Sequence, residues 1–219
     1  MATDQEKSKL NIVFDFDGTL ADSFQLALSV WNQIAGPAGL RIVYPEAGFR
    51  LRGLPAGAVL QELGVAWHQI PRLIGPAKRQ FGARIDEISP FPQIAEMLPA
   101  LVEQGNSLHV VTSNSVENVE KFLKRNELEF FESIHSASAF FGKGRLLKQL
   151  RRRFKDAPMV YVGDEVRDVE AARSAKIPVV AVTWGYNTAA LLAQAHPDQL
   201  ATEPRMLVDI FHSGFTRKK

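Results

Sequence analysis

Continuous apolar runs alternate with segments of helical periodicity over most of the chain. The runs are rich in β-branched residues and lack polar alternation, which is typical of strands buried on both faces of a parallel sheet. The four clear runs are Leu10 to Phe14, Leu108 to Val111, Met159 to Val162, and Val179 to Val182. A weaker fifth run lies at Ser133 to His135. The helical segments between the later runs are Val116 to Arg125, Arg145 to Phe154, and Val166 to Ala175. This alternation predicts an α/β fold with a doubly wound parallel sheet.

Residues 22–90 break this alternation. Their apolar positions have helical spacing over Asp22 to Ala35, Ala56 to Leu63 and roughly Trp67 to Ile88, with glycine and proline between the segments. We therefore expect an all-helical cap at 22–90, inserted into an α/β core formed by 1–21 and 91–219. Pro99 falls inside the next predicted helix, which we expect it to kink.

The amino-acid composition limits the binding partners and the kinds of site that the chain can have. The chain has 219 residues, is 46% hydrophobic, and carries a net charge of +2, too small to indicate nucleic acid or an anionic membrane. The absence of cysteine excludes disulfides and thiolate metal sites and fits a reducing compartment. The start MATDQEKSKL lacks the layout of a signal peptide, and proline and polar residues interrupt the uncharged run from Ile177 to Pro197. We expect a cytoplasmic monomer or homodimer without nucleic-acid or membrane partners, and we interpret the basic run Arg145 to Lys155 as a solvated helix face.

Two aspartates end the first predicted strand, in the stretch NIVFDFDGTL. Asp15 and Asp17 are two residues apart, so both side chains point to the same face, about 6.6 Å apart along the strand. A helix cap or a turn explains one aspartate, but not two. Burying two like charges is costly unless something offsets them. The carboxyl end of a parallel strand is also where open α/β sheets bind ligands.

A second acidic cluster follows the third clear strand, in YVGDEVRDVEAA. If a helix begins near Glu165, then Asp168 lies about one turn from its start, near Asp164. Taken alone, these acids could simply complement a helix dipole. Together with Asp15 and Asp17 they indicate a hard divalent cation with oxygen ligands, most simply Mg²⁺.

Two further segments supply groups that suit an anion. The stretch LHVVTSNS ends a strand with Thr112, Ser113 and Asn114, and we expect Asn114 to cap the following helix together with Glu117. Hydroxyls and free backbone N–H groups at a helix start form a phosphate-sized site. In FFGKG, Lys143 lies between two glycines; an isolated surface lysine is the default interpretation, yet the glycines suit a lysine that reaches inward.

In this order, the four segments resemble the motifs of the haloacid dehalogenase-like hydrolase superfamily over essentially the whole chain. The most specific match is DFDGTLADS at 15–23. The Gly-Asp-Glu form with Arg167-Asp168, and a helical insert directly after the first motif, are similar to the phosphoglycolate phosphatase-like subgroup. The resemblance implies a Rossmann-like core and a Mg²⁺-dependent phosphatase that acts on a small-molecule phosphate ester, with phosphoglycolate favoured.

The resemblance also implies roles for individual residues. Asp15 is the expected nucleophile that forms an aspartyl-phosphate, and Asp17 the expected acid and base. Thr112 and Lys143 are expected to contact the phosphoryl oxygens. The expected metal ligands are Asp15, Asp17 through its backbone carbonyl, Asp164 and Asp168, the last directly or through water. Ser113 and Asn114 are expected to offer backbone N–H groups to the substrate.

Two alternatives to a phosphatase stay open at this point. Dehalogenases of the superfamily lack the second aspartate, which is present here, but sugar-phosphate mutases share all four motifs, and a non-catalytic binding protein can keep the fold. From Arg41 to Arg84 there are seven Lys/Arg and two Glu, which gives +5. We hypothesise that Arg52 binds a substrate carboxylate; the alternative is a solvated basic face.

Overall fold

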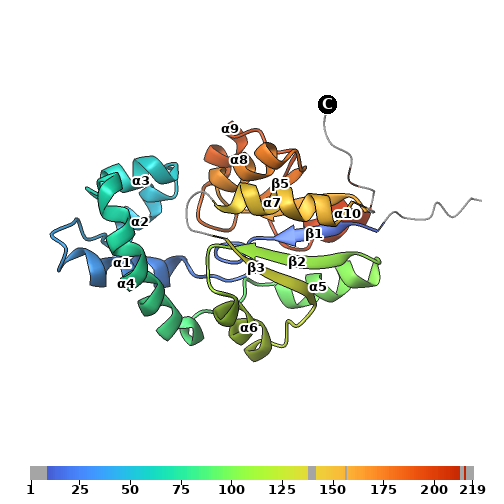
Figure 1. The fold of residues 1–219 in the computed structure, drawn as a ribbon, viewed down its shortest axis with the longest axis horizontal. Helices are drawn as coiled ribbons and strands as arrows, with labels where there is room; N and C mark the ends of the chain where they lie inside the picture. The colour runs from blue at the N-terminus through green and yellow to red at the C-terminus, as the bar shows by residue number, and fades with distance from the viewer. Residues whose placement is uncertain (1–8, 138–141, 156, 213–214, 216–219) are drawn as a thin grey trace, which may run out of the picture.

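A six-stranded parallel sheet carries helices on both faces, and a group of helices lies beyond one end of it (Figure 1). The computed structural model describes residues 9–137, 142–155, 157–212 and 215. The strands are β1 (Asn11–Phe14), β2 (Ser107–Thr112), β3 (Phe131–Ser136), β4 (Met159–Gly163), β5 (Val179–Val182) and β6 (Gln199–Ala201). All five expected strands are present. The sixth, β6, is a three-residue edge strand, too short for the hydrophobic pattern to reveal.

The strand order is β3-β2-β1-β4-β5-β6, and every neighbouring pair is parallel. The chain moves outward from β1 to β3 and then returns to place β4 beside β1. Phe14 at the end of β1 therefore pairs with Val110 on one side and Val162 on the other. This confirms the doubly wound sheet and places the reversal of strand order between β1 and β4, where such sheets bind ligands.

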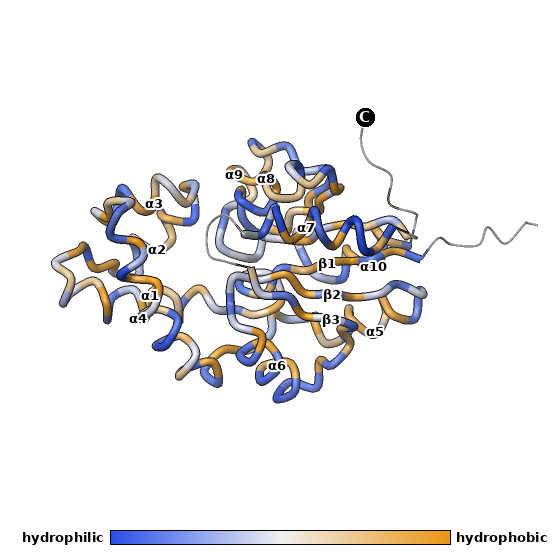
Figure 2. Tube along the Cα trace, viewed as in Figure 1, coloured by the Kyte–Doolittle hydropathy of each residue, from blue (hydrophilic) through white to orange (hydrophobic). Residues whose placement is uncertain are grey.

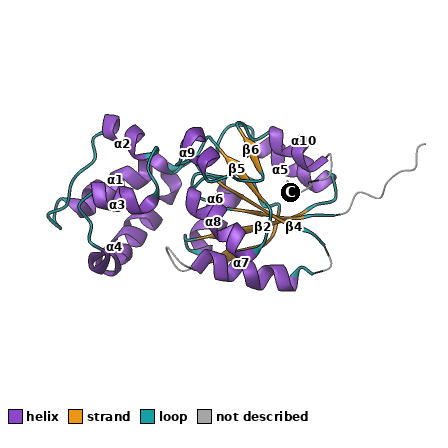
Figure 3. Ribbon diagram, turned by 90° about the horizontal axis from the view of Figure 1, so that it is seen from above, coloured by secondary structure: helices purple, strands orange, loops and turns teal. Residues whose placement is uncertain are grey.

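Helices pack against the strands of the sheet (Figure 3), in two hydrophobic clusters. One contains α5 (Ile94–Glu103), α6 (Val116–Arg125) and α10 (Met206–His212), and the other contains α7 (Gly142–Arg153), α8 (Val166–Ala175) and α9 (Ala189–Gln194). Ile12 and Phe14 of β1 belong to the first cluster and Val13 to the second, as alternating side chains require. Figure 2 shows the hydrophobic strands between these helices. α5 runs through Pro99 to Glu103, so the proline does not end it.

Four helices between β1 and β2 share a third hydrophobic cluster and are called the helical module: α1 (Phe24–Ala35), α2 (Pro45–Leu51), α3 (Ala56–Glu62) and α4 (Ile70–Ala83). The buried residues of this cluster are Val43, Leu51, Leu63, Val65 and Ile70. The helical segment expected at roughly Trp67 to Ile88 is present and consists of α4 and two short 3₁₀ helices that flank it, Trp67–Gln69 and Ile85–Glu87. Pro71 lies in the first turn of α4, where its missing N–H costs nothing.

The two segments that join the module to the sheet run side by side. The Asp22 N–H donates to the Ser89 carbonyl at 2.9 Å, and the Phe91 N–H donates to the Leu20 carbonyl at 3.1 Å. Both segments therefore pass the carboxyl end of β1, which brings the module next to the end of the sheet that carries Asp15.

The surface features weighed from the sequence have simple structural explanations. In α7, Leu147 and Leu150 are buried, whereas Arg145, Lys148 and the three arginines at 151–153 are exposed, as expected for a solvated amphipathic helix. Among the helices of the described ranges, none has the length and apolar character needed to cross a bilayer.

Candidate active site

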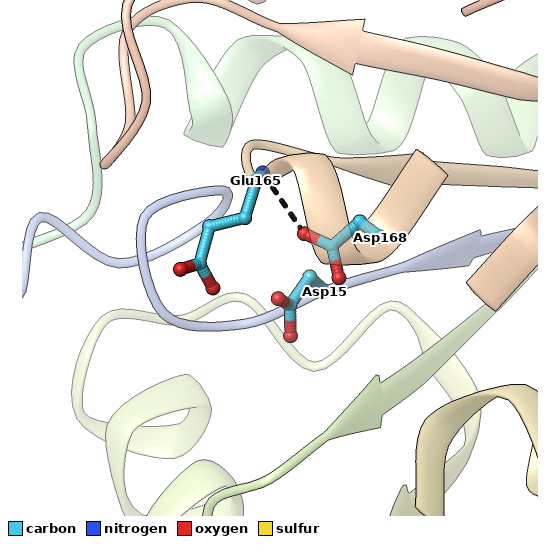
Figure 4. Close-up of side chains that lie close together, drawn as sticks. All are labelled: Asp15, Glu165 and Asp168. Atoms are coloured by element: carbon cyan, nitrogen blue, oxygen red, sulfur yellow. Dashed lines mark hydrogen bonds between the residues drawn. The ribbon is translucent and has the colours of Figure 1, made fainter. Parts of the chain in front are cut away.

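Acidic side chains gather at the carboxyl ends of β1 and β4, where the strand order reverses. Asp15 directly follows β1, and Asp168 lies in the first turn of α8 after β4. Figure 4 shows their carboxylates turned toward each other together with that of Glu165, and one oxygen from each lies within 4.8 Å of the others. The structure thus brings together acids that lie far apart in the sequence.

Glu165 is a member of this group that the sequence analysis did not assign to the site. It is the N-cap residue of α8, and its backbone N–H donates to Oδ2 of Asp168 at 3.0 Å. The signal was present, because Glu165 stands between Asp164 and Asp168 in the quoted run. Its direction depends on where the strand ends and the helix begins, which the hydrophobic pattern locates only to within a residue or two.

Lys143 lies inside the acidic group. Its Nζ donates to Oδ2 of Asp15 at 2.6 Å and to Oδ1 of Asp168 at 2.7 Å. Burial by itself lowers the pKa of Lys143, but the two carboxylates outweigh it and hold the pKa above its ordinary value. The lysine is therefore a fixed positive charge, as its flanking glycines suggested. Phe140 and Phe141 of the same motif lie outside the described residues.

The two aspartates of the first motif differ in their partners. Asp15 accepts the Lys143 ammonium and, at 2.7 Å, the backbone N–H of Phe16; burial raises its pKa to about 7, and Lys143 opposes that rise. Asp17 accepts from Nδ2 of Asn114, at 3.2 Å, through Oδ2, while its buried Oδ1 has no hydrogen-bond partner within 3.5 Å among the described residues. Burial raises the pKa of Asp17 as well. The two carboxyls thus differ in their partners, since one is paired with a cation and the other is not, while burial favours the protonated form of both.

Asp164 is fully buried next to the turn that follows β1. Its Oδ1 accepts from the Thr19 hydroxyl at 2.8 Å, and its Oδ2 accepts from the Tyr186 N–H at 2.7 Å. Gly18, at φ +77°, lies so close that a Cβ there would be 2.1 Å from Oδ2 of Asp164, and a Cβ at Gly185 would be 2.2 Å from the Gly18 carbonyl oxygen. The loop after β5, residues 183–187, therefore borders the site.

The end of β2 faces the same space, but Asn114 does not have the hydrogen bonds that we expected for it. Ser115, not Asn114, caps α6, since its side chain accepts from the Asn118 N–H at 3.2 Å. Asn114 is turned toward Asp17 instead. Its backbone N–H donates to Oγ1 of the buried Thr112 at 3.0 Å and so is already used.

Arg52 does not join the acidic group. Its guanidinium donates to the carbonyls of Trp184 (3.4 Å), Gly185 and Tyr186 (3.3 Å) and lies over the Phe24 ring. Arg52 thus ties the helical module to the loop after β5.

Arg167 is the cation beside the site that the sequence analysis did not assign, and it is salt-bridged to Glu165. Burial by itself lowers the pKa of Arg167. The neighbouring carboxylates, Glu165 foremost, outweigh this effect and hold the pKa above its ordinary value. The guanidinium is therefore a permanent positive charge at this edge of the sheet.

A cavity of about 300 Å³ lies between the helical module and the edge of the sheet that carries Asp17 and Asn114. The charged and hydrogen-bonding side chains that line it include those of Asp17, Lys78, Ser113, Asn114, Arg167 and Tyr186. Its size is at the lower end of the range for small-molecule sites. The site therefore combines paired carboxylates, a fixed ammonium group and room for a small ligand.

Known proteins share the sequence and the fold of this chain. The haloacid dehalogenase-like hydrolase family matches residues 12–182. A phosphoglycolate phosphatase from Synechococcus elongatus is 36% identical over 200 residues, which cover 90% of this chain and 94% of the relative. A haloacid dehalogenase-like hydrolase from Streptococcus pneumoniae has a TM-score of 0.76 at 25% identity and covers 93% of this chain and 98% of its own. The protein tyrosine kinase PtkA of Mycobacterium tuberculosis has a TM-score of 0.72 at 25% identity, covering 94% and 99%.

The sequence motifs, the sheet order and these relatives agree with one another. The family match spans most of the chain, and the Synechococcus relative aligns over nearly its whole length. The chain therefore belongs to the haloacid dehalogenase-like hydrolase family, within its phosphoglycolate phosphatase-like subgroup of phosphoric monoester hydrolases.

Proposed function

We propose that the chain is a Mg²⁺-dependent phosphatase that hydrolyses a small phosphomonoester through an aspartyl-phosphate on Asp15. The observation that carries this proposal is the contrast between the two aspartates of the first motif. Asp15 accepts the Lys143 ammonium, whereas Asp17 presents an unpaired buried oxygen and lines the adjacent cavity. A nucleophile needs the ionised form, and an acid needs a proton that it can hold near neutral pH.

The donor set fits Mg²⁺. Asp15, Glu165 and Asp168 offer carboxylate oxygens within 4.8 Å of one another, and hard oxygen donors are those that this ion prefers. We propose Asp15, Asp164, Asp168 and the backbone carbonyl of Asp17 as ligands, and add Glu165 to them. When bound, the ion supplies positive charge that offsets the carboxylates and the phosphoryl group.

In the first step, a carboxylate oxygen of Asp15 attacks phosphorus, and the bond from phosphorus to the alcohol oxygen breaks. Asp17 gives its proton to the departing alkoxide. Lys143 favours the ionised form of Asp15, because an opposite charge within hydrogen-bonding distance lowers a carboxyl pKa. We propose that Lys143 and the Thr112 hydroxyl also donate to the phosphoryl oxygens, with Ser113 beside them.

In the second step, Asp17 takes a proton from water, and that water's oxygen attacks the phosphorus of the aspartyl-phosphate. The bond between phosphorus and Asp15 breaks, which releases inorganic phosphate and restores the carboxylate. Asp17 thus loses a proton in the first step and regains one in the second, so its protonation state is restored over the cycle. The raised pKa of Asp17 supports this double role.

We propose that residues 22–90 act as a cap over this site and that a phosphoglycolate-like acid is the substrate to test first. The cavity between the helical module and the sheet edge supports the role of a cap. The names of the relatives support phosphoglycolate as the first substrate to test. Arg52 is engaged with backbone carbonyls, so Arg167 and Lys78, which border the cavity, are the better candidates to meet a substrate carboxylate.

The test is hydrolysis of p-nitrophenyl phosphate and of phosphoglycolate by the purified chain, with and without Mg²⁺. Asp15→Asn is expected to lower kcat by at least roughly 10³-fold. The matched control is Asp22→Asn, the same exchange at an exposed aspartate, which should leave the rate unchanged. Hydrolysis that survives both Asp15→Asn and chelation would refute the proposal. Isomerisation of a phosphosugar without release of phosphate would indicate a mutase instead.

A further inference from the structure

The cavity beside the acidic group has two chemically different walls. The sheet side is polar and includes Asp17 and Asn114. The side formed by α1 and α4 is almost entirely apolar and includes Val30, Trp31, Ile34, Ile74, Ala77 and Phe81. Lys78 is the only charged residue that the helical module contributes to the described lining.

The space exceeds what a two-carbon alcohol can fill. At about 300 Å³ it is roughly twice the ~150 Å³ apolar cavity that takes up a benzene molecule. With glycolate as the leaving group, most of the α1 and α4 wall would remain in contact with water. A larger apolar group would displace that water and gain from its own burial.

The apolar wall and the catalytic acid share one space. The unpaired Oδ1 belongs to Asp17, the same residue that lines this cavity and is proposed to protonate the departing alcohol. The alcohol part of the substrate must therefore begin at Asp17. From Asp17 the cavity extends toward α1 and α4, whose side chains form its other wall.

Two cations border the same cavity. Arg167 uses Nε and Nη2 on Glu165, and its guanidinium has further N–H donors. Lys78 is exposed at the rim, without an ion pair to any described residue. A ligand with one carboxylate and one apolar group matches this combination of walls.

We propose that the substrate class is phosphate esters of 2-hydroxy acids that carry an apolar side chain, with that side chain against α1 and α4. This inference rests on the proposed phosphatase function and narrows its substrate. Such esters keep the carboxylate and phosphate of phosphoglycolate and add a group for the apolar wall.

The test is kcat/KM for the phosphate esters of glycolate, 2-hydroxybutyrate, 2-hydroxy-4-methylpentanoate and 3-phenyllactate. The values are expected to rise about fourfold for each methylene that the cavity buries. Equal or falling values through the series would overturn the inference.

Ile34→Asn tests the wall directly. Ile34 is half-buried, lines the cavity, and belongs to none of the hydrophobic clusters of the described residues, so its replacement should leave the fold intact. The variant is expected to flatten the series while leaving the glycolate ester unchanged. Ile42→Asn, at a residue 47% exposed and outside the cavity lining, is the control and should leave the series steep. Should Ile34→Asn fail to fold, Ala77→Leu, which extends into the cavity, should lower the 3-phenyllactate value selectively.

The two proposals fail in different ways. If p-nitrophenyl phosphate and all four esters resist hydrolysis, the phosphatase function is wrong, and the substrate class falls with it. If phosphoglycolate is hydrolysed but Ile34→Asn affects all esters equally, the phosphatase function stands and the apolar subsite is wrong.

Discussion

His109 in the middle of β2 should make the stability of this protein depend on pH. The side chain is only 2% exposed. Its Nε2 pairs with Oδ1 of Asn11 at 3.1 Å and its Nδ1 with the Ser133 hydroxyl at 2.9 Å, while Phe154 stacks on the ring. Because the Asn11 oxygen can only accept, Nε2 carries the proton and Nδ1 accepts from Ser133. His109 is therefore a core histidine with satisfied hydrogen bonds.

The size of this pH effect on stability follows from the difference between the pKa of His109 in the folded chain and in the unfolded chain. Burial lowers the pKa of His109 from 6.5 to about 4. Between these values the unfolded chain binds the proton and the folded chain does not, so stability falls as the pH falls. The loss is about 2 kcal/mol at pH 5 and about 3 kcal/mol at pH 4, while above pH 6.5 the contribution is flat.

The assay is urea unfolding of the wild type and of His109→Gln from pH 4 to pH 7.5, with chelator present. Glutamine keeps an N–H donor for Asn11 but does not titrate. The buried carboxylates contribute equally to both proteins, so they cancel in the difference. The free-energy gap should shift by about 3 kcal/mol in favour of the variant between pH 7.5 and pH 4. Parallel stability curves, or an ordinary NMR titration midpoint for His109, would show that the ring is not held neutral by burial.

Two substitutions test the packing and the charge of the site. Gly185→Ala should cost roughly 1–3 kcal/mol of stability and reduce phosphatase activity, because its Cβ would lie 2.2 Å from the Gly18 carbonyl oxygen. Gly57→Ala is the control and should stabilise α3 by ~0.5–1 kcal/mol, because no atom lies within 4 Å of its Cβ. Chemical denaturation measures both changes, and equal effects would contradict the steric argument. Lys143→Met should lower kcat roughly 10²–10³-fold and move the acidic limb of the pH–rate profile upward, since the pKa of Asp15 rises without its cation. Lys124→Met, at an exposed position on α6, is the control, and an unshifted acidic limb in Lys143→Met would remove Lys143 from the proposed role.

The sequence alone determined the class of fold and the location of the chemistry. Buried parallel strands leave a continuous apolar signature, and side chains two apart on a strand must share a face. The pair Asp15 and Asp17 at a strand end, with Asp168 one turn into a later helix, therefore placed an acidic site at one sheet edge before any coordinates. These features are local, and local geometry can be derived from spacing.

Only the tertiary structure decided how each polar group is used. Asn114 contacts Asp17 instead of capping α6, Arg52 is occupied by backbone carbonyls, and Glu165 turns into the acidic group. Each of these outcomes depends on contacts between segments that are distant along the chain or on the residue at which a strand gives way to a helix. The apolar cavity wall has the same origin, because it exists only where α1 and α4 meet the carboxyl end of the sheet. Hydrophobic spacing predicts which side of a helix is apolar, but not whether that side meets another helix or a substrate.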